Sequence, residues 1–163
     1  MIEVRQAEAG DLDAILAIYN DAVIRTTATY DYEPRTADAQ RQWFEAKRAQ
    51  DFPVLVGRDA GVVAGFASYG PFRPWAAYLH TVENSIYVAA QKRGRGVGTA
   101  ILGPLVELAR GRGFHAMVAG IDAANEASLK LHAKFGFEKV AHFREVGWKF
   151  ERWLDLVFLE RIF

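Results

Sequence analysis

The sequence feature that most constrains this chain is a glycine-rich turn at residues 93–99, between a predicted strand and a predicted helix. The turn reads Arg-Gly-Arg-Gly-Val-Gly-Thr, with glycine at every second position from Gly94 to Gly98. Such a backbone turns tightly and approaches a ligand closely, and the N–H groups that open the following helix attract phosphate. Arg93 and Arg95 add positive charge. The same glycines would also suit a turn that binds nothing, so the motif alone leaves both interpretations open.

Two common phosphate-binding motifs fit this turn poorly. A P-loop requires a lysine before the serine or threonine that follows its last glycine, and here Gly98 is followed directly by Thr99. A dinucleotide fingerprint would start at Gly94 and Gly96 but has Thr99 where its last glycine belongs, although Asp122 has the spacing of a ribose-binding acid. The strands before the turn are predicted to form hairpins, whereas that fingerprint belongs to a repeated parallel unit. A dinucleotide-dependent oxidoreductase is therefore the least favoured function.

Hydrophobic periodicity predicts strands and helices along the whole chain. Strands are expected at residues 2–6, 53–57, 62–69, 80–88, 115–121, 138–146 and 153–159, and helices after an Asp11 cap and at 36–49, 100–110 and 126–135. The order strand, loop, helix, strand, helix in the second half is typical of a locally parallel sheet. Two prolines predict an irregular loop at 70–75. With 163 residues and no linker or repeat, we expect one mixed α/β domain spanning 1–163.

Composition excludes several classes of function. The chain has 20 Lys+Arg and 20 Asp+Glu, and this balance argues against binding to nucleic acid or to an anionic membrane. It has no cysteine, which excludes disulfides, cysteine zinc sites and a thiol nucleophile. The first residues do not resemble a signal peptide and no apolar stretch is long enough to span a membrane, so a cytoplasmic protein is expected. His80 and Glu83 would lie on opposite faces of a strand, and no metal site is predicted.

Several motifs together resemble one enzyme family. The spacing Arg93-x-x-Gly96-x-Gly98 is similar to the acetyl-CoA pyrophosphate loop of the GNAT N-acetyltransferases. Further motifs resemble the phosphinothricin and methionine sulfone/sulfoximine acetyltransferase branch, at residues 81–88, 119–121, 125–132, 136–137, 146–150 and 153–155. The resemblance covers nearly the whole chain in order. It implies a mostly antiparallel sheet with a parallel β-α-β core flanked by helices, and acetyl-CoA as co-substrate.

The resemblance also implies how the chain would act. It implies direct transfer of acetyl, in a ternary complex, to the α-amine of a small amino-acid-like acceptor. Alternation along residues 81–88 places Glu83 on the same face as Ser85 and Tyr87, and the resemblance gives Glu83 the role of general base. His132 lies where many family members have a tyrosine that protonates the leaving thiolate. It is either that acid or a neighbour of CoA.

The remaining candidate residues fall into two groups. The resemblance implies contacts to acetyl-CoA from Tyr87, Val88, Arg93, Gly94, Arg95, Gly96, Val97, Gly98, Thr99, Asn125 and Ser128. Asn125 has the alternative role of a helix N-cap. An acceptor carboxylate requires a cation, for which Arg73 and Lys149 are candidates, with Trp75, Tyr78 and Tyr30 as walls of the pocket. Each of these also suits an ordinary surface position.

Two other functions remain open on the sequence alone. A second enzymatic hypothesis keeps the fold but takes a peptide, polyamine or aminoglycoside as acceptor, although polyamines and aminoglycosides would favour an acidic pocket over Arg73 and Lys149. An acetyl-CoA-sensing module without turnover is the non-enzymatic alternative. The family commonly forms homodimers with the acceptor site near the interface, so we also expect a homodimer.

Overall fold

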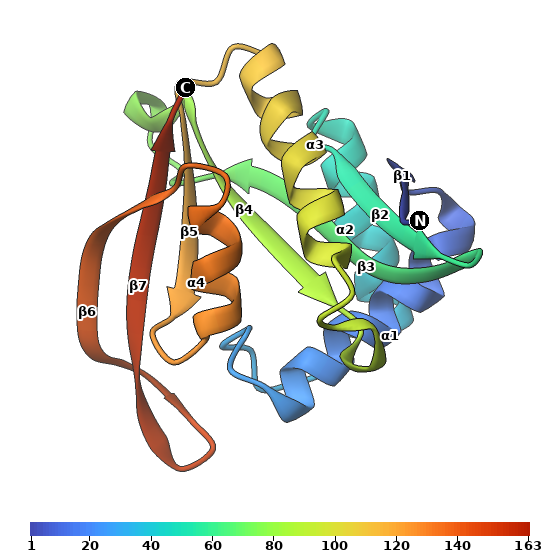
Figure 1. The fold of residues 1–163 in the computed structure, drawn as a ribbon, viewed down its shortest axis with the longest axis horizontal. Helices are drawn as coiled ribbons and strands as arrows, with labels where there is room; N and C mark the ends of the chain where they lie inside the picture. The colour runs from blue at the N-terminus through green and yellow to red at the C-terminus, as the bar shows by residue number, and fades with distance from the viewer.

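The computed structural model describes all 163 residues and contains one seven-stranded sheet with helices on both faces (Figure 1). The strands are β1 (Glu3–Gln6), β2 (Val54–Asp59), β3 (Val62–Pro71), β4 (Thr81–Val88), β5 (Ala116–Asp122), β6 (Glu138–Lys149) and β7 (Arg152–Ile162). The helices are α1 (Leu12–Arg25), α2 (Ala37–Ala49), α3 (Val97–Gly111) and α4 (Glu126–Ala133), with short 3-10 turns at Ala9–Asp11, Ala76–Tyr78 and Ala90–Lys92. The order across the sheet is β1-β2-β3-β4-β5-β7-β6.

The central feature of the sheet is the parallel pair β4 and β5. Every other neighbouring pair is antiparallel, which confirms the predicted sheet with a parallel β-α-β core. β4 and β5 pair only where Thr81–Glu83 faces Ala116–Val118. Beyond Glu83 the two strands diverge, as Figure 1 shows, and they leave a gap in the middle of the sheet. Backbone groups along this gap have no strand partner and face the site described below.

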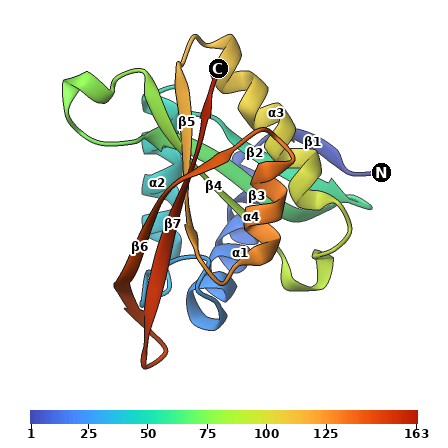
Figure 2. The same ribbon diagram turned by 60° about the vertical axis from the view of Figure 1, so that its left-hand side comes forward.

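Helices cover the two faces of the sheet and enclose two hydrophobic cores (Figure 2). The larger core joins α3 to the sheet through residues such as Ile101, Leu105 and Val82, and the smaller joins α1 and α2 through Ile15 and Phe44. On β4, Val82, Ile86 and Val88 pack with the larger core, whereas Tyr87 packs against the smaller one. The predicted alternation along this strand is therefore confirmed.

Several predicted boundaries differ from the structure. β3 extends through Gly70 to Pro71, where the sequence predicted a loop, because a proline at the end of a strand loses only one ladder donor. α3 begins three residues earlier than predicted, because Gly96 takes a left-handed conformation with φ 80° and forms the N-cap. Asp11 precedes α1 as expected, but its carboxylate accepts hydrogen bonds from Arg5 and from the Glu8 N–H instead of capping the helix.

The β6–β7 hairpin is longer than predicted and projects beyond the rest of the sheet (Figure 1). Its turn is formed by Phe150 and Glu151, which have φ values of 54° and 58°. Positive φ is uncommon for residues other than glycine, asparagine and aspartate, so the usual turn signal is absent from the sequence. The sequence analysis therefore ended β6 and began β7 too far from this turn.

Candidate active site

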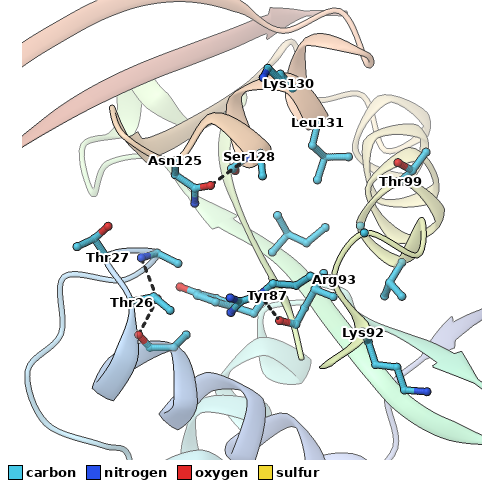
Figure 3. A pocket seen from close by; sticks show the side chains of 18 of the residues that line it. Thr26, Thr27, Tyr87, Lys92, Arg93, Thr99, Asn125, Ser128, Lys130 and Leu131 are labelled. Atoms are coloured by element: carbon cyan, nitrogen blue, oxygen red, sulfur yellow. Dashed lines mark hydrogen bonds between the residues drawn. The ribbon is translucent and has the colours of Figure 1, made fainter. Parts of the chain in front are cut away.

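A cleft of about 630 Å³ opens between the glycine-rich turn, the end of β4 and helix α4 (Figure 3). Of the residues predicted to contact acetyl-CoA, those that line this cleft are Tyr87, Val88, Arg93, Gly94, Gly96, Val97, Gly98, Thr99, Asn125 and Ser128. They come from three separate elements, and the divergence of β4 from β5 brings them together. Arg95 is the exception: its guanidinium turns toward Asp59, with 3.8 Å between Nη1 and Oδ2, and does not line the cleft.

The glycine-rich turn presents unpaired backbone donors to this cleft. Gly94 and Gly96 have φ values of 72° and 80°, and no atom lies within 4 Å of where a Cβ would stand on either residue. The first helical hydrogen bond of α3 runs from Ala100 N–H to Gly96 C=O. The N–H groups of Val97, Gly98 and Thr99 therefore have no partner in the helix. This arrangement fits the negatively charged pyrophosphate of CoA.

The basic side chains Arg93 and Lys92, beside the turn, each have a partner within the protein. The Arg93 Nε–H donates to Val88 C=O over 3.3 Å, which ties the turn to the end of β4. Lys92 lines the cleft as well, and its ammonium is 2.8 Å from Asp59 Oδ2. Lys92 and Arg95 together lower the pKa of the Asp59 carboxyl, chiefly through the Lys92 hydrogen bond. The sequence analysis missed Lys92 because it precedes the motif and has no distinguishing neighbour.

His132 lies under a second, smaller cavity of about 70 Å³ between β4 and β5, which Asn84, Ser85 and Ser128 also line. The imidazole is 1% exposed. Its Nε2 is 3.1 Å from Asn84 Oδ1 and its Nδ1 is 2.9 Å from Ser128 C=O. Burial lowers the pKa of His132, although the Ser128 carbonyl acts in the opposite direction. Both ring nitrogens therefore face oxygen acceptors, and these contacts hold His132 between α4 and Asn84 of β4.

Glu83 lies on β4 where the strands begin to diverge, on the face covered by α1 and α2. Its side chain is 33% exposed, and its Oε2 is 3.8 Å from Arg73 Nη1. A Cβ on Gly120 of β5 would lie only 3.1 Å from Glu83 Oε1, so the glycine gives the carboxylate its space. Burial raises the pKa of Glu83, and the charge of Arg73 partly offsets that increase. The result is a reachable carboxylate with strengthened affinity for a proton.

Arg73 is fixed by aromatic rings at the edge of the same face. Its guanidinium carbon lies 4.3 Å from the centre of the Phe72 ring and 5.9 Å from that of Phe158. Arg73, Trp75 and Tyr78 line a cavity of about 600 Å³ beside the start of β4. Trp75 and Tyr78 are 66% and 41% exposed, and Glu83 does not line this cavity.

Lys149 and Tyr30, which the sequence placed among the acceptor-binding candidates, contact other parts of the protein in the structure. Lys149 is 4% exposed, and its ammonium donates to Thr26 C=O over 2.8 Å and to Thr29 C=O over 2.7 Å. The Tyr30 hydroxyl donates to Asp155 C=O, and burial together with the Asp122 charge raises the pKa of Tyr30 to about 12. Two of the three Lys149 donors are thus used inside the protein.

The loop that Lys149 holds forms one wall of the large cleft. Thr26, Thr27 and Ala28, which follow α1, line it directly (Figure 3). Gly147 contributes space, because a Cβ there would stand 2.7 Å from Tyr30 Cε2. The sequence analysis missed this wall because its contacts join residues more than 100 positions apart.

Two further observations concern the chain as a whole. No helix is long and apolar enough to cross a membrane. Nowhere do three or more histidine, cysteine, aspartate or glutamate side chains gather as a metal-binding group. His142 instead pairs with Asp155, with 2.7 Å between Nε2 and Oδ2.

Comparison with known proteins identifies the family. Residues 13–137 match the model of the acetyltransferase (GNAT) family. The chain belongs to the GNAT acetyltransferase family. It is 47% identical to an L-methionine sulfoximine/L-methionine sulfone acetyltransferase of Pseudomonas paraeruginosa, over 96% of this chain and 92% of that protein. It is 36% identical to a phosphinothricin N-acetyltransferase of Streptomyces coelicolor, over 98% and 95% of the two chains.

A solved structure gives the same result for the fold. A putative acetyltransferase from Salmonella typhimurium, determined with its cofactor acetyl-CoA, superimposes with a TM-score of 0.96. The two chains are 41% identical, and the match covers 99% of this chain and 93% of the other. This GNAT protein is therefore an acetyl-CoA-dependent N-acetyltransferase, as the resemblance in the sequence implied.

Proposed function

We propose that this acetyltransferase acts on the α-amine of a small amino-acid-like acceptor of the methionine sulfone, methionine sulfoximine or phosphinothricin type. The observation that carries the proposal is the pair of Glu83 and Arg73, 3.8 Å apart and each partly open to solvent. An α-amino acid has its amine and its carboxylate on the same carbon, so one acceptor molecule reaches both groups together. The acceptors in the names of the relatives are α-amino acids of this kind.

Glu83 acts as the general base in this proposal. An α-amine has a pKa near 8 and is mostly protonated at neutral pH, so it must lose a proton before it attacks. The Glu83 carboxylate, whose pKa is raised by burial, takes that proton directly or through one water. The new C–N bond forms as the C–S bond of the thioester breaks, and the thiolate that leaves takes a proton from solvent. The chain has no cysteine, so no acetyl-cysteine intermediate forms.

Arg73 binds the acceptor carboxylate. A planar guanidinium makes two parallel hydrogen bonds to a carboxylate, which fixes the orientation of the amine as well as its position. The rings of Phe72 and Phe158 lie beside the guanidinium, and its Nη1 faces Glu83 Oε2 over 3.8 Å. Trp75 and Tyr78 bound the cavity on the outer side.

Acetyl-CoA occupies the large cleft in this proposal. The N–H groups of Val97, Gly98 and Thr99 bind the pyrophosphate together with Arg93, and Tyr87, Val88 and Ser128 contact the remainder of the molecule. Asn125 is the N-cap of α4, since its Oδ1 accepts from Ser128 N–H over 3.1 Å, and it also faces the cleft. His132 is a positioning residue that fixes α4 to Asn84 of β4.

The direct test is thiol release from acetyl-CoA with a panel of acceptors. We expect turnover with methionine sulfone, methionine sulfoximine and phosphinothricin, and much less with polyamines or aminoglycosides, because Arg73 repels their positive charges. Turnover confined to a peptide N-terminus or a polyamine would overturn the acceptor class. Tight acetyl-CoA binding without turnover on any acceptor would support the sensing module instead.

We also propose that residues 1–163 act as a single cytoplasmic domain that forms a homodimer. Large apolar side chains on the β6–β7 hairpin support the dimer: Phe143, Trp148, Phe150 and Trp153 are 47%, 47%, 48% and 60% exposed. A cluster of this kind on a small protein is typical of an interface. Light scattering after gel filtration should give twice the chain mass of 18.2 kDa. Trp153→Glu should shift that mass toward the monomer.

A further inference from the structure

Lys47 on α2 is a partly buried cation that the acetyl-transfer mechanism above does not use. Its ammonium donates to Tyr69 C=O over 2.8 Å, and the ring centres of Phe52 and Trp43 lie 5.6 and 6.0 Å away. It forms no ion pair with any carboxylate, although twelve other ion pairs occur in the chain. Removing a cation from water without a counter-ion is costly, and the ammonium uses one of its three donors within the protein.

Gly70 places this ammonium on the face of the sheet that carries Glu83. A Cβ on Gly70 would stand 2.9 Å from Lys47 Nζ, so the ammonium lies over the strand where a side chain would otherwise be. Gly70 is the direct register partner of Glu83 in the antiparallel pair of β3 and β4. Side chains at such paired positions have Cβ atoms about 5 Å apart, so Lys47 Nζ lies within roughly 8 Å of Glu83 Cβ.

Lys47 and Arg73 flank Glu83 from opposite directions. The Glu83 carboxylate leans toward Gly120 of β5, and Arg73 packs on Phe158, the β7 residue paired with Gly120. Lys47 lies on the other side, over β3. An acceptor whose amine meets Glu83 and whose carboxylate meets Arg73 therefore has its side chain free to extend toward β3 and α2.

We propose that Lys47 determines acceptor specificity by donating a hydrogen bond to an oxygen at the far end of the acceptor side chain. This inference rests on the proposed function and adds the recognition of the side chain to it. Methionine sulfone, methionine sulfoximine and phosphinothricin all have an oxygen-bearing sulfur or phosphorus atom at the δ position, where methionine has a bare thioether. Only the oxidised or phosphinate groups accept a strong hydrogen bond.

The charge state of Lys47 is consistent with this role. Burial, with a smaller contribution from the charge of Arg35, lowers the pKa of Lys47 to about 8. The ammonium is therefore mostly charged at neutral pH, and an incoming phosphinate would supply the missing counter-ion. A hydrogen bond to a charged group is stronger than one to a neutral oxygen, so phosphinothricin should depend on Lys47 more than methionine sulfone does.

The test compares kcat/KM for phosphinothricin, methionine sulfone and methionine in wild type, Lys47→Met and Lys47→Arg. We expect Lys47→Met to lower kcat/KM roughly 10- to 100-fold for phosphinothricin and several-fold for methionine sulfone. Methionine should change less than about two-fold, because its thioether accepts hydrogen bonds only weakly. Lys47→Arg should restore part of the loss. Arg48→Met is the matched control, since Arg48 lies on the same helix with a 65% exposed side chain.

Each alternative outcome has a distinct meaning. An equal loss for all three acceptors would assign Lys47 a structural role, and no loss for any of them would exclude contact with the acceptor; either result overturns the proposal. The KM for acetyl-CoA and the thermal midpoint report whether the variants fold. A wild-type enzyme that acetylates none of the three would overturn the proposed acceptor class and this inference with it. Failure of the Lys47 proposal and failure of the proposed acceptor class are distinguishable, because in the first case the wild-type enzyme still acetylates these acceptors.

Discussion

Replacing Glu83 with glutamine separates catalysis from stability. Glutamine has the shape of glutamate but cannot take a proton from the attacking amine. Positioned general bases contribute about 10²- to 10⁴-fold, so kcat at pH 7 should fall by that factor. The KM for acetyl-CoA should remain within about two-fold of wild type, because Glu83 does not line the acetyl-CoA cleft.

The structure also sets the expected effect on stability. The pair with Arg73 is 3.8 Å long with side chains 33% and 41% exposed, so its loss costs less than about 1 kcal/mol. Burial raises the pKa of Glu83, so the folded state holds its proton more tightly than the unfolded state does. That contribution to stability is present at low pH and is lost as the pH rises through the folded pKa. At neutral pH, Glu83→Gln removes an unfavourable buried charge, and the two effects nearly cancel.

The assay is thiol release measured against pH, with thermal unfolding on the same samples. In wild type, kcat/KM should fall as the pH drops through the raised pKa of Glu83, and this acid limb should disappear in Glu83→Gln. The midpoint should move by no more than about 3 °C, given the usual relation for a chain of this size. Glu126→Gln, an exposed carboxylate on α4, is the matched control. A Glu83→Gln rate within three-fold of wild type would refute the assignment of the base.

Three other substitutions test the remaining parts of the site. Arg73→Ala should raise the KM for amino-acid acceptors at least ten-fold more than that for acetyl-CoA, by loss of a charge-assisted pair; equal effects in steady-state kinetics would exclude the carboxylate anchor. Lys149→Met leaves two carbonyls without a donor and should lower stability by about 2 kcal/mol while raising the KM for acetyl-CoA; an unchanged denaturant midpoint would contradict this. Gly96→Ala forces a side chain into a φ of 80° and should weaken acetyl-CoA binding in calorimetry, at a cost of about 1 kcal/mol in stability; unchanged affinity would mean that the turn does not bind the pyrophosphate.

Much of the fold was predictable because its signals are local. The alternation on β4, the glycines of the turn and the hairpin at 59–61 each depend on neighbouring residues. The strands before the glycine-rich turn were predicted to form hairpins, and Ala60 and Gly61 turn the chain between β2 and β3 with φ values of 51° and 82°. The same local reasoning failed at Phe150 and Glu151, where residues without a turn preference are held in a left-handed conformation by the pairing of β6 with β7.

The candidate site was predictable only in part. The residues of the glycine-rich turn lie within a few positions of one another, so their common orientation follows from the chain itself. Arg95 does not share this orientation. Its guanidinium turns toward Asp59 of β2, a strand far from Arg95 in the sequence. His132 was expected to act as an acid or as a neighbour of CoA. Its partner Asn84 lies 48 positions away in the chain, so the buried contact between them depends on the packing of α4 against β4.

The sequence by itself therefore determined the family, the glycine-rich turn and the face of β4 that carries Glu83, because these depend on spacing and alternation along the chain. Only the tertiary structure decided what the lysines do. Lys149 was a candidate partner for the acceptor carboxylate, and in the structure its ammonium donates to the carbonyls of Thr26 and Thr29. Lys47 was not a candidate until Gly70 placed its ammonium beside the register partner Glu83. The partners of a long flexible side chain are the groups that the tertiary structure places near its end. Spacing along the sequence does not show which groups these are.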